Sequence, residues 1–342
     1  MKLYHAHIYP MDREPIENGW VSIQDGKITE LGQGEIVPGP EDRDLAGGML
    51  LPGFVDAHTH LGIIENGIGF EGDDCNEASD PFTPQLRAID GINPMDRCFA
   101  EARRRGITAV LSSPGSANAC GGQIAAIKTA GRRIDSMLIR TAGVKFALGE
   151  NPKSVYNDRD ETPITRMATA ALIREGLAAA RRYRSDLAAH EADPENLDAP
   201  EFDAKHEALL PLLRGECKAF FHCHRADDMF TALRIAKEFS LDPVLIHGTE
   251  GHLIADLLAP EKNRGHHRPP AVRPVQAGAE PCRAAQRRSA APERGAHRHL
   301  HGSSGGAPPV PAPVGGSGGE GRSALRCCTV CHYPGGGKAG RH

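Results

Sequence analysis

Two histidines separated by one residue, His58 and His60, follow directly on an apolar stretch at residues 50–57. The stretch predicts a buried strand, and Pro52 and Gly53 predict the turn that starts it. Side chains two positions apart in a strand point to the same side. We therefore expect both imidazoles to leave the strand end together, close enough to bind one metal ion.

Two later strand patterns also end in histidine. The apolar runs before His224 and His247 are each followed by a helix pattern. The carboxyl ends of parallel barrel strands meet at one mouth. We therefore expect His58, His60, His224 and His247 to converge there as metal ligands. For His222, inside the first of these strands, a helix cap or a core hydrogen bond is the favoured interpretation.

Asp227 lies three residues after His224, where the next helix opens. One interpretation is the N-cap of that helix, a position that favours aspartate. The other is a catalytic general acid or base. The two roles are compatible, and the residues do not separate them.

The coarse pattern alternates strands with helices, which predicts parallel βα units. The Asp25-Gly26 turn predicts a hairpin over residues 19–32. Turn residues predict a surface loop at 193–200. Further elements are expected as helices at 95–103 and 165–189 and as strands at 107–111 and 137–146.

Residues 47–60 resemble the first barrel strand of the amidohydrolase superfamily, and most closely its imidazolonepropionase-related branch. The resemblance runs from about residue 1 to about residue 263. It implies an α/β fold, a (β/α)₈ TIM-like barrel, here incomplete at the C-terminus, with a small N-terminal β-sandwich portion. The expected division is a partial sandwich at 1–50 and a barrel of about six βα units at 51–263.

The resemblance also implies chemistry. Members of the family hydrolyse C–N bonds, amide or cyclic amide, with metal-activated water, so we expect one or two ions of Zn²⁺ or a similar divalent metal and a small-molecule amide substrate. Two-metal members bridge the ions with a carboxylated lysine or a glutamate, which points to Lys145, with Glu150 as the alternative. Residues 115–123 resemble the family's substrate-side loop.

Composition changes near Gly265. Beyond it the chain has no Ile, Phe, Met, Trp, Asp or Asn, and Arg, Gly, Pro, Ala and His dominate. Such a segment buries too little apolar surface to offset its ordering entropy, so residues 264–342 are expected to be disordered. A natural low-complexity tail is one interpretation.

A shifted reading frame is the favoured interpretation of this tail. Codons can be chosen for residues 266–275, 297–307 and 311–316 so that translation starting one base later gives amino-acid sequences that resemble the family. The three sequences also follow one another in the same order as in the family. A single-base insertion near Gly265 would explain this, and would leave an impaired hydrolase. A shifted frame also explains the haem-attachment pattern at residues 328–332 and the histidine-rich and basic tracts of the tail without a functional role for them.

Bulk composition excludes little but is consistent with these expectations. A formal net charge of −4 argues against nucleic-acid binding. The absence of a long apolar run or a leader favours a cytoplasmic protein without membrane contact. A homo-oligomer is a further expectation. The alternative to a hydrolase is a non-catalytic metal- or partner-binding remnant with a disordered basic tail.

Overall fold

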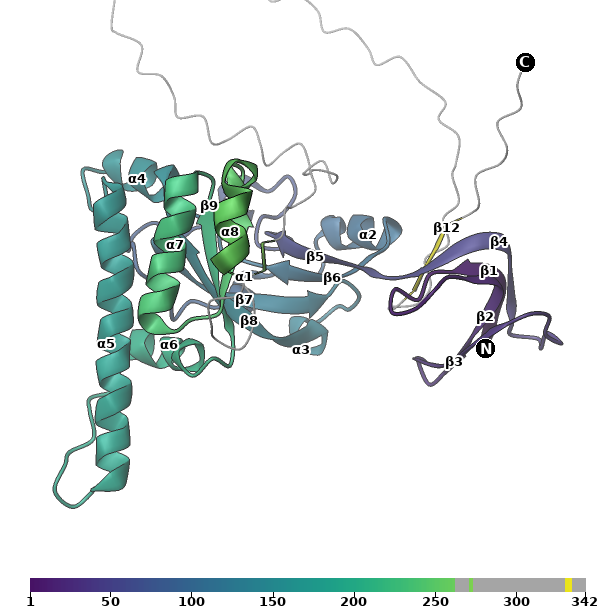
Figure 1. The fold of residues 1–342 in the computed structure, drawn as a ribbon, viewed down its shortest axis with the longest axis horizontal. Helices are drawn as coiled ribbons and strands as arrows, with labels where there is room; N and C mark the ends of the chain where they lie inside the picture. Colours follow the sequence, from purple (N-terminus) through teal and green to yellow (C-terminus); the bar gives the residue numbers. More distant parts are fainter. Residues whose placement is uncertain (262–270, 273–329, 334–342) are drawn as a thin grey trace, which may run out of the picture.

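A computed structural model describes residues 1–261, 271–272 and 330–333. The described residues form two β-sheets that follow one another along the chain, with helices gathered around the second (Figure 1). The predicted disorder and frame shift of residues 264–342 lie outside the described residues, apart from the two short strands within that range. Among the described residues, no helix is both long enough and apolar enough to cross a membrane.

The first sheet has five described strands in the order β12-β4-β1-β2-β3. Asp25 and Gly26, both at positive φ, make the turn between β2 and β3, so the predicted hairpin is confirmed. An apolar core that includes Val21 and Leu50 lies on this sheet. The strands are β1 (Lys2–Ile8), β2 (Ile16–Gln24), β3 (Lys27–Gln33), β4 (Arg43–Pro52) and β12 (Val330–Tyr333).

The chain passes from the first sheet to the second at Gly53. A Cβ at this position would meet the Thr108 hydroxyl oxygen at 2.1 Å, so only glycine permits this close approach. The predicted turn at Pro52 and Gly53 and the strand that it starts are confirmed: β4 ends at Pro52, and β5 (Phe54–Thr59) begins in the other sheet. The expected burial of this strand is wrong, because Phe54 and Val55 are exposed.

The second sheet has the described order β11-β10-β9-β8-β7-β6-β5. Its strands are β5 (Phe54–Thr59), β6 (Ile107–Ser112), β7 (Cys120–Lys128), β8 (Leu138–Ala147), β9 (Lys218–Cys223), β10 (Pro243–His247) and β11 (Ala271–Val272). The pairs β5–β6, β8–β9, β9–β10 and β10–β11 are parallel, as expected. Strand β7 is antiparallel to both neighbours, so the uniformly parallel expectation fails there, and residues 120–123 are strand rather than loop.

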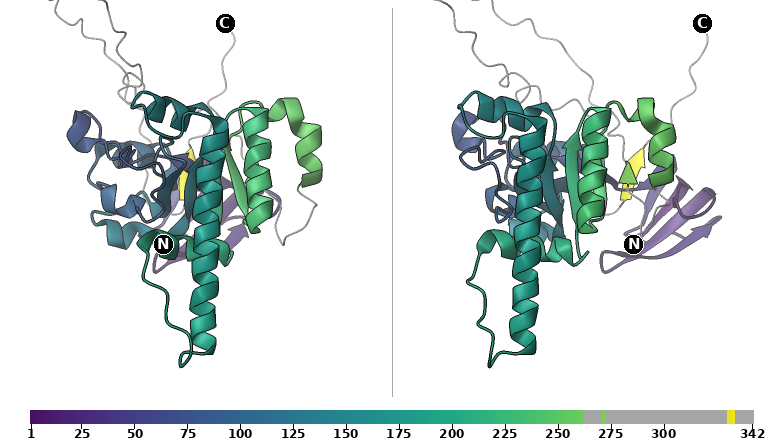
Figure 2. Two further views of the ribbon diagram at one scale, coloured as in Figure 1. Left: turned by 90° about the vertical axis from the view of Figure 1, so that its left-hand side faces the viewer. Right: turned by 60° about the vertical axis from the view of Figure 1, so that its left-hand side comes forward.

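Helices cover the outer face of this sheet (Figures 1 and 2). The main core lies between β8–β10 and helices α5–α8, and a second core packs α1–α3 against β6 and β7. The helices are α1 (Ala88–Gly91), α2 (Arg97–Arg104), α3 (Ile134–Met137), α4 (Glu150–Asn157), α5 (Arg166–Ala192), α6 (Ala204–Leu213), α7 (Ala226–Phe239) and α8 (Ala255–Glu261), with short 3₁₀ turns at Gly69–Gly72 and Gly251–Ile254.

Two helices show why the local sequence signals succeed. Asp96 caps α2 by accepting a hydrogen bond from the Cys98 amide at 2.9 Å, and Thr165 caps α5 by accepting one from the Ala168 amide at 3.0 Å. Helix α5 extends beyond the sheet at its C-terminal end (Figure 2).

Candidate metal centre

Three histidines converge where β9 and β10 end. His222 lies on β9, His224 follows that strand, and His247 ends β10. One ligand atom from each lies within 4.8 Å of the other two. The ring centroids are 4.6 to 4.7 Å apart. The parallel register, which pairs His247 with Cys223, brings these rings to one level at the strand ends.

Two of the three histidines, His222 and His224, have a hydrogen bond at one ring nitrogen. The Nδ1 of His222 shares a hydrogen bond with the Ser116 hydroxyl at 2.9 Å, and the Nδ1 of His224 shares one with the Thr249 hydroxyl at 2.7 Å. The Nε2 of His222 is buried and has no hydrogen-bond partner among the described residues. Metal-binding histidines characteristically bind the ion through one nitrogen while a hydrogen bond orients the other.

His58 and His60 lie beside this group. Their ring centroids are 5.2 Å apart, and the His58 ring is also 5.2 Å from the His247 ring. His60 makes a hydrogen bond from Nδ1 to the Ser113 carbonyl at 2.6 Å. Strands β5 and β10 stand far apart in the sheet order, so this contact requires the sheet to curl until its ends approach, as in a barrel.

Burial keeps the imidazoles of His58, His60, His222 and His247 neutral. Loss of solvent lowers the pKa of His222 to about 2 and the pKa values of His60 and His247 to about 4. The pKa of His58 is lowered further still, by burial and then by the charge of Lys145. A neutral imidazole is the form that binds metal, so the site is ready to bind an ion at neutral pH.

Lys145 projects from β8 into this group and is fully buried. Its Nζ donates a hydrogen bond to the Pro114 carbonyl at 3.2 Å. Burial lowers its pKa to about 8, and its charge depresses the pKa values of the nearby histidines. Glu150 is instead exposed at the first residue of α4. Of the two residues predicted as a bridge, only Lys145 lies among the histidines.

Asp227 lies at the surface, paired with Arg225 at 2.9 Å. Helix α7 begins at Ala226 with Arg225 at the cap position, so the N-cap interpretation of Asp227 is wrong. Its role as a general acid or base stays a prediction. The next residue, Asp228, is the buried one and pairs with Arg166 at 3.0 Å.

Two features of the site were missed from the sequence. His222 does make a core hydrogen bond, as expected, but it also belongs to the cluster of possible metal ligands. The spacing of His222 and His224, which repeats that of His58 and His60, is the sequence signal that could have indicated this. His247 has φ of 69°, a conformation that non-glycine residues rarely adopt and that occurs often at functional sites.

The residues present fit a divalent ion. Neutral imidazoles suit zinc and similar transition metals, and structural and catalytic zinc sites use three or four such ligands. The unpartnered Nε2 of His222, inside a cluster of three donors, is the observation that favours a bound ion, because buried polar atoms otherwise find a partner.

Comparisons with known proteins place the chain. No protein-family model matches it. The crystal structure of an amidohydrolase from Thermotoga maritima is 41% identical in sequence and superposes with a TM-score of 0.72, covering 76% of this chain and 68% of that one.

Two curated relatives match over different lengths. The amidohydrolase tasK of Hapsidospora irregularis is 33% identical over 268 residues, which are 71% of this chain but 26% of that protein. The imidazolonepropionase of Thermoplasma acidophilum is 40% identical over 55 residues, or 16% of this chain and 13% of the relative. The chain thus spans about a quarter or less of these relatives. The 41% identity to the Thermotoga structure, over 68% of that chain, shows that this chain belongs to the amidohydrolase superfamily.

Proposed function

We propose that the protein is a metal-dependent hydrolase of C–N bonds in small-molecule amides. The observation that carries the proposal is the donor cluster of His222, His224 and His247, with the buried Nε2 of His222 left without a partner among the described residues. Relatives named amidohydrolase, imidazolonepropionase and 5'-deoxyadenosine deaminase support the type of bond.

His222, His224 and His247 would hold one divalent ion, and His58 and His60 would provide ligands for the same ion or a second one. Zinc or a similar ion bound there would polarise the scissile carbonyl and activate a water molecule for attack. Lys145, which is buried and whose charge lowers the pKa of histidines in both groups, is proposed as the bridging ligand in its carboxylated form. Its own lowered pKa increases the fraction of neutral amine, the form that reacts with carbon dioxide.

The protein's own groups set the surroundings of the reaction. Below the histidines, apolar residues fill the inner face of the sheet, among them Phe220, Val244 and Ile246. This floor keeps bulk water away and strengthens electrostatic interactions above it. Asp227 is proposed to carry a proton to the leaving nitrogen, which requires it to leave its surface pair with Arg225 when substrate binds.

The test compares two pairs of histidines that share one spacing. His58→Ala with His60→Ala should release bound metal and abolish hydrolysis of a panel of N-acyl amino acids. The matched control is His5→Ala with His7→Ala, a pair of the same spacing on β1 in the other sheet. Metal content is measured by elemental analysis of the purified chain.

The outcomes separate the proposed functions. Loss of metal and activity in the first variant alone supports the hydrolase. Bound metal without hydrolysis of any amide, also in a frame-corrected chain, would favour the non-catalytic remnant. Metal content unchanged by the first pair would refute the ligand role of His58 and His60.

A further inference from the structure

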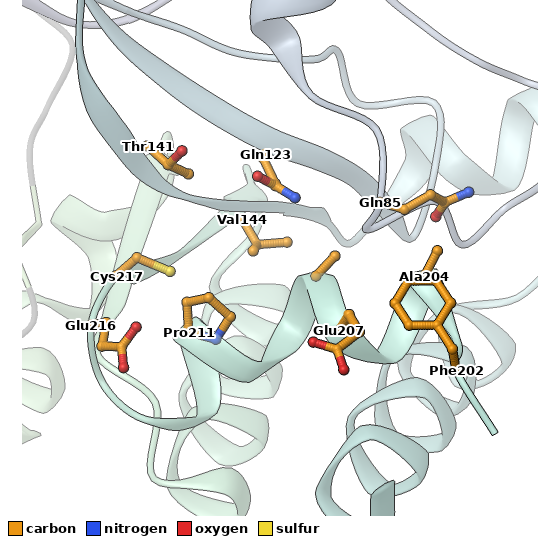
Figure 3. A pocket seen from close by; sticks show the side chains of 11 residues that line it. Gln85, Gln123, Thr141, Val144, Phe202, Ala204, Glu207, Pro211, Glu216 and Cys217 are labelled. Atoms are coloured by element: carbon orange, nitrogen blue, oxygen red, sulfur yellow. The ribbon is translucent and has the colours of Figure 1, made fainter. Parts of the chain in front are cut away.

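A cavity of about 530 Å³ lies between α6 and the outer face of β7 and β8 (Figure 3). Gln123 and Val144 on the strands form one wall, and α6, which carries the lining residues Glu207 and Pro211, forms the opposite wall. Small-molecule sites in proteins typically measure roughly 300 to 1,000 Å³. The cavity is therefore large enough for a small organic ligand.

The cavity is separate from the histidine site. Successive residues of a strand face opposite sides of a sheet, so Val144 lines the cavity while Lys145 projects to the inner face. The register confirms this, because Gln123 pairs with Val144 and Gly122 pairs with Lys145. A ligand in this cavity would sit behind the strand that carries Lys145.

One wall of the cavity holds an unsatisfied acceptor. The Oε1 of Gln85 is buried and has no hydrogen-bond partner among the described residues. Leaving a buried polar group unpaired is costly, so such groups usually have a partner. A ligand with an N–H group would supply that partner, whereas a ligand with acceptors alone would not.

The charges of the lining point to the same kind of ligand. Glu207 and Glu216 line the cavity, and none of the lining residues that the structure describes is basic. Each carboxylate also has a neighbour: the Tyr183 hydroxyl donates to Glu207 at 2.6 Å, and Arg214 pairs with Glu216 at 3.5 Å. The partly compensated site remains acidic, and Phe202 at one end provides an apolar surface.

We propose that this cavity is a second small-molecule site, which binds an organic amine with an apolar body. The ammonium group lies near Glu207 and Glu216, and the apolar body packs against Val144, Pro211 and Phe202. Anions of the same shape are excluded by the carboxylates. The proposal does not depend on the proposed hydrolase activity.

The probe is 2-phenylethylamine, titrated into the full chain by ligand-observed NMR, with 3-phenylpropanoate as the anionic counterpart. The amine should bind saturably, with a dissociation constant on the order of 1 mM for so small a ligand. The anion should not bind. Ala208→Trp, which fills the cavity from α6, should abolish amine binding, and Ala189→Trp on the exposed part of α5 is its control.

A second variant tests the proposal even if Ala208→Trp does not fold. Glu216→Gln should weaken amine binding about two- to fivefold, the range expected for one partly exposed charge pair, while Glu201→Gln at an exposed position should not. His224→Ala should leave amine binding unchanged. Absence of saturable amine binding, equal binding of the anion, or loss of binding in His224→Ala would overturn the proposal.

Discussion

Replacing Ser116 by alanine should weaken metal binding although Ser116 is not itself a predicted ligand. Its hydroxyl lies 2.9 Å from the Nδ1 of His222. His222 is only 3% exposed, so its ring has little other access to water once the hydroxyl is removed. Without this hydrogen bond, the imidazole is free to turn or to place its proton on Nε2, the nitrogen that faces the other histidines.

The expected magnitude follows from the burial of this contact. An unpaired buried polar group costs about 1–3 kcal/mol. Each 1.4 kcal/mol changes a binding constant about tenfold. Loss of a group that orients a metal-binding histidine typically weakens metal affinity about 10–100-fold. We therefore expect Ser116→Ala to weaken zinc binding within that range, without removing a ligand.

The assay is a competition titration of zinc against a chromophoric chelator. Ser185→Ala is the matched control, because its hydroxyl also makes one hydrogen bond, to the Arg181 carbonyl at 3.0 Å, but on an exposed part of α5. Circular dichroism confirms that both variants are folded. Zinc affinity of Ser116→Ala equal to that of the wild type and of Ser185→Ala would refute the assignment of His222 as an oriented ligand.

Three further predictions follow from other parts of the structure. In metal-free protein, Lys145→Met should raise the melting temperature at neutral pH, and this advantage should shrink as the pH rises from about 8 towards 10.5. The reason is that native Lys145 loses its proton in this range while unfolded lysine keeps it, so the wild type gains stability. An advantage that stays constant in melts across this range would contradict the burial argument. In urea unfolding, Asp228→Asn should lower the free energy of unfolding by about 1–3 kcal/mol, because Asp228 is buried against Arg166. Asp227→Asn should change this free energy by less than about 0.5 kcal/mol and should lower turnover instead. The reverse order of the two effects would show that Asp227 is the structural residue. Deleting one base near the Gly265 codon should increase amide hydrolysis relative to the chain as given, and equal activity of the two proteins would argue against the shifted frame.

Local signals in the sequence predicted much of the fold. The Asp25-Gly26 turn specifies its hairpin because positive φ at both positions suits the twist of the paired strands. The caps at Asp96 and Thr165 mark the helix starts by satisfying amides that the helix itself leaves free. The alternation of side chains along a strand likewise predicted that His58 and His60 would share a face.

Other features depended on which segments pair in space. Nothing within residues 120–128 specifies that β7 is antiparallel to β6 and β8, because strand direction is set by the partner strands. The close approach of Gly53 to Thr108 has the same origin, since Thr108 lies far along the chain.

The sequence alone determined which strand ends carry histidines, because that information is contained in a few neighbouring residues. The tertiary structure alone decided that His222 joins His224 and His247, that Lys145 is buried beside them, and that Asp227 lies at the surface while Asp228 does not. Burial and the distances between side chains depend on the curl of the whole sheet and on the helices packed behind it. They arise from contacts between residues distant in sequence, which no local pattern encodes.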